Sequence, residues 1–162
     1  MTKFENINDE HEHPSNDEGS NYNNFAICAT GLMAILDETQ TLSLAKALLV
    51  MPIIMHDSTV RHLGKQNVRA REVSALTSTR PDLFLNFNSR FLAGLTPTLN
   101  AIQLLAEAKY ISFNGELVLT KALTFSAAIG DRANRIKKAA KNIAALLTSP
   151  EDELYLNLRI EL

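Results

Sequence analysis

Hydrophobic side chains recur every three or four residues along most of this chain from Asn24 onward, which is the spacing of amphipathic helices. The first predicted helix follows the N-cap residue Asn24 and ends near Asp37. A second is predicted from about Ser43 through Met51, with Pro52 kinking it or setting its last turn. Because this second helix is apolar on all sides, we expect it in the middle of the core.

Shorter helices are predicted directly after this apolar run. Asp57 or Ser58 is suited to cap a helix that ends at Leu63, with Gly64 as its C-terminal stop. A further helix is expected over residues 67–76. These elements should present polar side chains beside the core.

Two prolines mark the predicted starts of the next two helices. Pro81 fits the first turn of a helix that extends to about Leu92. Thr96 is suited to cap a separate helix over residues 97–108, with Pro97 at its first position. The sequence therefore predicts a break in the chain direction near Thr96.

Two short alternating segments at residues 110–120 follow, and Asn114-Gly115 joins them. This dipeptide favours a type I′ turn, in which both central residues have a positive φ, so a tight β-hairpin is predicted. A compact, mainly α domain in which a helix leads straight into a hairpin has the order of a winged helix, with the hairpin as the wing. That scaffold serves DNA-binding proteins and protein adaptors alike, so the predicted fold leaves both functions open.

The last third of the chain returns to helical spacing. A helix is predicted over residues 126–147, with a basic outer face. Ser149 as N-cap and Pro150 at the first helical position then predict a short terminal helix through Leu158.

Residues 1–23 differ from the rest in composition. They contain one lysine against six carboxylates, a net charge of −5, and little to bury. Such a segment cannot offset the entropy lost on ordering, so we expect a disordered acidic tail before a single domain over residues 24–162. His11 and His13 could form a metal pair, but two ligands in a tail are a poor site, and a solvated tail is the favoured interpretation.

The composition narrows the class of protein further. A chain of 162 residues with 46% hydrophobic and 21% charged residues and a net charge of −2 has enough apolar surface for one domain. The single cysteine, Cys28, excludes an internal disulfide and a cysteine-rich zinc module. The longest apolar stretch, residues 44–55, is too short to cross a membrane, and no export signal is visible. We therefore expect a cytoplasmic protein.

A search for catalytic chemistry finds isolated candidates only. His56, Ser58, Thr59 and His62 are close in sequence, but no catalytic signature surrounds them, and capping and packing explain them better. The glycines form no nucleotide-binding loop. We expect no enzyme activity, no bound metal and no cofactor.

Basic residues form two groups that could meet phosphate groups or an acidic partner. The first group lies beside the apolar helix, and the second lies on the long helix of the last third, where a solvated helix face is the favoured interpretation. The groups are Arg61, Lys65, Arg69 and Arg71, and Arg132, Arg135, Lys137, Lys138 and Lys141.

Residues 48–63 combine an apolar run that contains a proline with a histidine, His56, and a short basic helix that contains Thr59. A Pro-Asp-Leu segment at residues 81–83, a phenylalanine and then Arg90 follow. Together these motifs resemble the middle component of bacterial three-component ABC systems, and the similarity extends over about residues 24–160.

The resemblance implies a non-enzymatic accessory subunit that binds an SMC/Rad50-like ABC ATPase, as in Lamassu-type defence against phages and plasmids. Such a subunit would couple DNA sensing to an effector, often a nuclease, and would meet DNA through the complex. The residues expected to bind partners are His56, Ser58, Thr59, Arg61, Lys65, Asn114 and Gly115. Those expected as possible DNA-backbone contacts are Arg69, Arg71, Arg132, Arg135, Lys137, Lys138 and Lys141.

Two other functions stay open at this point. A free-standing winged-helix DNA-binding regulator would bind duplex DNA through the basic group at residues 61–71. A small hydrolase would use His56 or His62, although no supporting residues accompany them.

Overall fold

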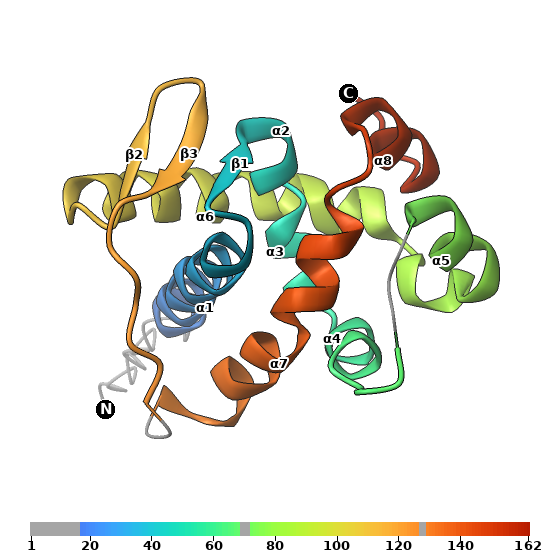
Figure 1. Ribbon diagram of the computed structural model, residues 1–162, viewed down its shortest axis with the longest axis horizontal. Coiled ribbons are helices and arrows are strands. Elements are labelled where there is room, and N and C mark those ends of the chain that lie inside the picture. Colours follow the sequence, from blue (N-terminus) through green and yellow to red (C-terminus); the bar gives the residue numbers. More distant parts are fainter. Residues whose placement is uncertain (1–16, 69–71, 127–128) are drawn as a thin grey trace, which may run out of the picture.

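The computed structural model describes residues 17–68, 72–126 and 129–162, and their fold is mainly helical, as predicted (Figure 1). The elements in chain order are α1 (Asp17–Thr39), β1 (Thr41–Ser43), α2 (Leu44–Ala47), α3 (Val50–Ile54), α4 (Asp57–Leu63), α5 (Val73–Thr79), the 3₁₀ helix η1 (Pro81–Phe84), α6 (Phe87–Glu107), β2 (Ile111–Phe113), β3 (Glu116–Leu119), α7 (Asp131–Leu146) and α8 (Glu151–Asn157). None of the helices in these ranges is both long and apolar enough to span a bilayer.

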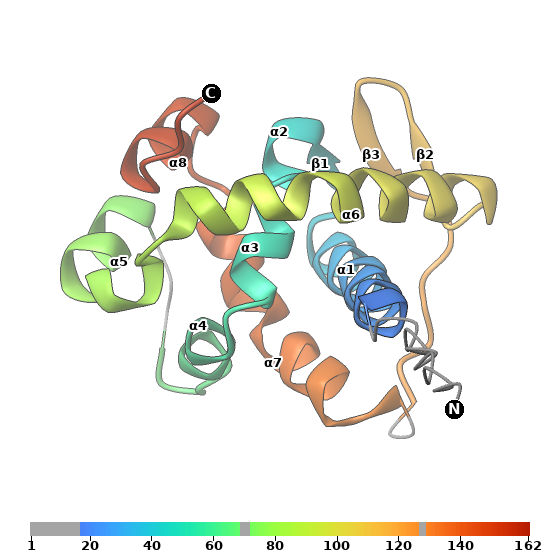
Figure 2. The ribbon, with the colours of Figure 1, turned by 180° about the vertical axis from the view of Figure 1, so that it is seen from behind.

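Helix α1 packs against both α6 and α7, and this three-helix contact holds much of the core (Figures 1 and 2). Leu32, Ile35 and Leu36 of α1 are fully buried, as is Ile136 of α7. The helix begins at Asp17, earlier than predicted, and Asn24 lies inside it rather than at its N-cap. An asparagine inside a helix costs only a few tenths of a kcal/mol relative to alanine, so the helix can continue through it. Residues 1–16, the rest of the predicted acidic tail, lie outside the described residues.

The apolar stretch predicted as one central helix forms two short helices, α2 and α3, separated at Leu48 and Leu49. Pro52 lies within α3, where it has no N–H to donate to the Leu48 carbonyl and its ring crowds that oxygen. The break therefore falls four residues before the proline. All residues of α3 are buried, whereas only Ala47 is buried in α2, so the predicted central position is confirmed for α3 and not for α2.

The hairpin predicted at residues 110–120 is confirmed as β2 and β3, and β1 extends it to an antiparallel sheet of order β1-β3-β2. The predicted turn type is wrong: Gly115 has a φ of +83°, but Asn114 is not in the positive-φ region, and Phe113 pairs with Leu117 across a three-residue loop. The strand β1 was not predicted, because a three-residue segment is too short to show alternation.

Helix α6 is continuous, so the predicted break at Thr96 is wrong. Pro97 lies inside the helix and leaves the Ala93 carbonyl without its usual N–H donor. Ala93 is exposed, and so the loss falls on the outer face rather than in the core. The helix predicted from Pro81 to Leu92 is instead η1 followed by the first turns of α6, with Asn86 between them in the left-handed region at φ +54°.

Three further boundaries differ from the prediction. The helix expected over residues 67–76 is observed as α5, and the one expected over 126–147 begins only at Asp131. Pro150, not Ser149, is the N-cap of α8. The Ser149 hydroxyl instead accepts a hydrogen bond from the Val73 amide at 3.4 Å, because it is turned towards the start of α5, against which α8 packs.

Candidate functional site

Helix α4 follows the buried helix α3 and packs against α7 (Figure 1). Its N-cap is His56, without a side-chain cap, so the expected capping by Asp57 or Ser58 is wrong, whereas Gly64 is the C-cap as predicted. Helix α4 has one buried face and one exposed face. Thr59 belongs to the buried face, and Ser58 to the exposed one.

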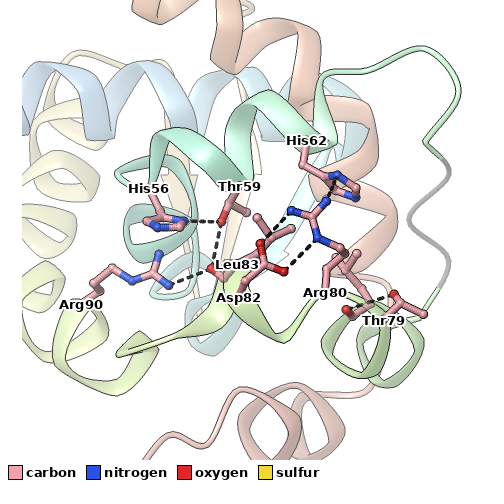
Figure 3. Close-up of polar contacts among 9 residues, drawn as sticks. His56, Thr59, His62, Thr79, Arg80, Asp82, Leu83 and Arg90 are labelled. Atoms are coloured by element: carbon pink, nitrogen blue, oxygen red, sulfur yellow. Dashed lines mark hydrogen bonds and ion pairs between the residues drawn. The ribbon is translucent and has the colours of Figure 1, made fainter.

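Figure 3 shows that the buried face of α4 joins a hydrogen-bonded network. The Thr59 hydroxyl donates to the Leu83 carbonyl at 3.0 Å and lies 2.8 Å from Nδ1 of His56. Since the hydroxyl proton is directed to Leu83, Nδ1 of His56 must carry the proton of their contact. Thr59 is fully buried in the isolated chain, and its hydrogen bonds connect α4 to η1.

Arg90, from the first turn of α6, holds the same network from the other side (Figure 3). Its Nη1 donates to the Pro52 carbonyl at 2.9 Å, and its Nη2 donates to the carbonyls of Leu83 and Leu85 at 3.0 and 3.1 Å. The guanidinium also lies 5.1 Å from the centroid of the Phe87 ring. One side chain thus connects α3, η1 and α6, and its partial burial lowers the pKa of Arg90.

A second polar group lies at the other end of α4 (Figure 3). Arg80 binds Asp82 through two hydrogen bonds of 2.9 and 2.8 Å, and its Nη1 lies 2.9 Å from Nδ1 of His62. Because a guanidinium can only donate, His62 accepts this bond with an unprotonated Nδ1. Asp82 in turn has a lowered pKa, chiefly because of its hydrogen bonds from Arg80.

The surroundings of both histidines favour the neutral form. Burial lowers the pKa of His56, and the charge of Arg90 lowers it further. Burial also lowers the pKa of His62, together with the charges of Arg80 and Lys65. Both imidazoles therefore resist protonation in the folded protein more than in the unfolded chain.

We expect the protein to lose stability as the pH falls below about 6.5, the ordinary histidine pKa. The unfolded chain binds these two protons more tightly than the folded protein does. The two neutral histidines therefore make their full contribution to the free energy of unfolding above that pH, and the contribution is lost as the pH falls through their pKa values in the folded protein. Urea unfolding of the wild type and of a His56→Asn, His62→Asn variant at pH 7.5 and 5.5 measures the effect. The variant should lose less stability between the two pH values; an equal loss would contradict the prediction.

Helix α4 is attached to α7 by polar contacts along its length. Asp57 is paired with Arg61 of its own helix and, at 3.5 Å, with Arg135 of α7. At the other end, the Asn142 amide donates to the Leu63 carbonyl at 2.6 Å. The backbone of α4 is thereby fixed, while Arg61 remains largely exposed.

The predicted DNA-contact residues of α7 fall into two kinds. Arg132 and Arg135 are half-buried and turned towards the neighbouring elements, since Arg132 donates to the sulfur of Met55 at 2.9 Å. The lysines Lys137, Lys138 and Lys141 are exposed. Lys137 lies 4.7 Å from the centroid of the Phe125 ring.

The other predicted site residues lie in different parts of the molecule. Ser58 and Lys65 are exposed beside Arg61 on the α4 side, whereas Arg69 and Arg71 lie outside the described residues. Asn114 and Gly115 are exposed at the tip of the hairpin, at the opposite end of the molecule from α4 (Figure 1). The expected partner-binding residues therefore form two separate surfaces.

The contact of His56 with Thr59 has the distance of a catalytic base and its nucleophile, but its geometry is unsuited to catalysis. Thr59 is 0% exposed, and its proton is directed to the Leu83 carbonyl rather than to the imidazole. Within the described ranges, no three His, Cys, Asp or Glu side chains gather as metal ligands. His56, Thr59, Leu83 and Arg90 instead form a bracing network, a set of hydrogen bonds that fixes the position of α4.

Comparison with curated proteins found no match, and comparison with solved structures found none either. The comparison with protein families did find one. The family model described as ABC-three component (ABC-3C) system Middle Component 3 matches residues 14–162, which is nearly the whole chain. The match includes α4, its bracing network and the hairpin, and it agrees with the resemblance noted in residues 48–63 and 80–90. The chain therefore belongs to the ABC-three component (ABC-3C) system Middle Component 3 family.

Proposed function

We propose that this chain is a non-enzymatic adaptor subunit that binds the SMC/Rad50-like ABC ATPase of a bacterial defence system and couples DNA sensing to an effector such as a nuclease. The observation that carries the proposal is the family match, because a middle component of a three-component system has partner components. The resemblance of residues 48–63 and 80–90 to Lamassu-type accessory subunits supplies the kind of partner.

The surface proposed for the ATPase is the exposed face of α4 and the residues just after it. Arg61 and Lys65 lie there beside Ser58, and the hydrogen bonds of Thr59 and Asn142 fix the helix beneath them. A fixed helix loses little conformational entropy on binding, which favours affinity. Its basic side chains suit an acidic surface on the ATPase.

Co-expression of this chain with the ATPase and effector components of its system tests the proposal. We expect a stable complex on size-exclusion chromatography with mass determination, and we expect Arg61→Glu with Lys65→Glu to weaken association with the ATPase by about tenfold or more. A chain that elutes alone in the presence of both components would refute the adaptor function. If instead the double variant associates as the wild type does, the α4 surface is not the contact.

The exposed lysines of α7 provide a matched control. Lys137→Glu with Lys141→Glu makes the same change in net charge on another side of α7, where Lys137 lies beside Phe125 and Lys141 lines a groove with Glu38 and Glu116. We expect this second variant to retain the ATPase but to reduce the amount of duplex DNA bound by the complex, because lysines near phosphates contribute a salt-dependent attraction. If instead the α7 variant loses the ATPase and the α4 variant loses DNA, then α7 binds the ATPase and α4 lies at the DNA.

A free-standing DNA-binding regulator is the second candidate, and the basic side chains near α4 and α7 favour it. Helix α6, which leads into the hairpin, opposes it. In a helix-turn-helix protein the recognition helix carries polar and basic side chains to the bases. From Phe91 to Ala106, α6 has no charged residue at all. Salt-sensitive, sequence-specific duplex binding by the isolated chain would favour the regulator.

A further inference from the structure

A cavity of about 320 Å³ lies between α4 and α7, next to the end of α3. Asp57 and Arg135 lie at its rim, with 55% and 38% of their side chains exposed, so the cavity opens to solvent. It combines a small apolar interior with two guanidinium groups. Three buried apolar residues and three charged residues line it: Ile54, Val60 and Ile136, and Asp57, Arg132 and Arg135.

The two arginines of this cavity lack a complete set of acceptors. Arg132 donates to the sulfur of Met55 at 2.9 Å, and a thioether sulfur is a weak acceptor. Within the part of the chain that the structure describes, no carboxylate is paired with Arg132. Nε of Arg135 is buried without a hydrogen bond, and the Asp57 carboxylate, 3.5 Å away, is shared with Arg61. A buried donor without an acceptor is costly, so an incoming anion would complete the site.

The charges around the cavity also favour an anion. Three guanidinium groups, those of Arg61, Arg132 and Arg135, lie around the single carboxylate of Asp57. A neighbouring groove shares Arg135 with one further carboxylate and two ammonium groups, which leave the excess of positive charge in place: Asp131, Lys137 and Lys138.

We propose that this cavity receives a glutamate side chain from the ATPase, an inference that rests on the proposed adaptor function. The methylene groups of a glutamate would pack against the apolar interior, and its carboxylate would accept hydrogen bonds from Arg132 and Arg135. Hydrogen bonds between a planar guanidinium and a carboxylate are short and directional, which gives such a site specificity. Because Arg61 lies beside the cavity, the site is continuous with the α4 surface proposed for the ATPase.

The affinity of the full chain for the purified ATPase component, measured by calorimetry, tests the inference. Arg132→Gln with Arg135→Gln should raise the dissociation constant by about 30-fold or more, because a carboxylate enclosed in the interface loses its partners. The matched control is Lys137→Gln with Lys141→Gln, which removes two positive charges from another side of α7 and should leave the dissociation constant unchanged. Equal midpoints of urea unfolding would show that the loss is one of binding and not of folding.

Arg132→Lys with Arg135→Lys separates a shaped site from general attraction between charges. An ammonium group keeps the charge but cannot donate two parallel hydrogen bonds, so this variant should recover only part of the affinity. Full recovery by the lysines would overturn the inference, as would wild-type affinity of the glutamine variant. If the wild type itself does not bind the ATPase, the adaptor function fails together with this inference.

Duplex DNA and the chain's own acidic residues 1–16 are the alternative occupants. If the glutamine variant keeps its affinity for the ATPase but lowers the amount of duplex DNA bound by the complex, the cavity receives a phosphate group and the inference is wrong. Replacing the carboxylates of residues 1–16 by amides should leave the affinity for the ATPase unchanged. Tighter binding by that variant, lost again when Arg132→Gln and Arg135→Gln are added, would assign the cavity to residues 1–16 and overturn the inference. The substitutions are Glu5→Gln, Asp9→Asn, Glu10→Gln and Glu12→Gln.

Discussion

Replacing Phe91 by alanine should lower the free energy of unfolding by about 3–5 kcal/mol, the usual cost of emptying a buried aromatic site. Phe91 is 1% exposed, and its ring meets that of Tyr155 edge to face with the centroids 5.8 Å apart. Tyr155 also donates from its hydroxyl to the Ala45 carbonyl at 2.8 Å. The ring of Phe91 therefore supports the contact of α8 with the rest of the core.

Urea unfolding followed by circular dichroism measures this loss. Phe113→Ala makes the same substitution on the hairpin, where the ring is 47% exposed, and should change the free energy of unfolding by less than about 1 kcal/mol. Equal effects of the two substitutions would show that Phe91 does not have the buried position described.

Replacing Arg90 by alanine should cost about 2–4 kcal/mol, because three carbonyl oxygens lose a charged donor. The variant should also raise the pKa of His56, since the charge of Arg90 now lowers it. Arg90→Lys should recover only part of the stability, because an ammonium group cannot donate in the geometry of a planar guanidinium. Unfolding in urea gives the first quantity, and an NMR titration of the imidazole gives the second.

Arg80→Ala is the appropriate comparison for Arg90. Its pair with Asp82 is exposed to solvent, so its removal should have a much smaller effect on stability. An Arg90→Ala variant as stable as Arg80→Ala, with an unchanged His56 pKa, would show that the three carbonyls do not depend on Arg90.

The sequence predicts this fold well wherever local signals act alone. Helical spacing identified α1 and α7, Gly64 marked the end of α4, and Asn114-Gly115 identified the hairpin, since all of these signals depend on residues close together in the chain. The prediction from the sequence was wrong where contacts between distant parts of the chain determine the structure. Thr96 and Pro97 have the pattern of a helix start, yet they lie within α6, which packs against α1 and α3 along its length.

The candidate site was predictable in position but not in the roles of its residues. The motif at His56 and Thr59 marked the right helix, but the burial of Thr59 depends on the Leu83 carbonyl, 24 residues away. Arg90 was visible as part of the Pro-Asp-Leu motif, although its hydrogen bonds to three carbonyls could not be read from the sequence. The separation of α4 from Asn114 and Gly115 is likewise a property of the folded chain.

The unbroken course of α6 through Pro97 sets the distance between the two ends of the molecule. Its first turn contributes Arg90 to the brace behind α4, and its last turn leads into β2. A helix of 21 residues has a length of about 32 Å. If the partner components bind at α4 and at the hairpin, as proposed, their two binding surfaces on this chain would be held at a fixed spacing unless α6 itself bends or melts.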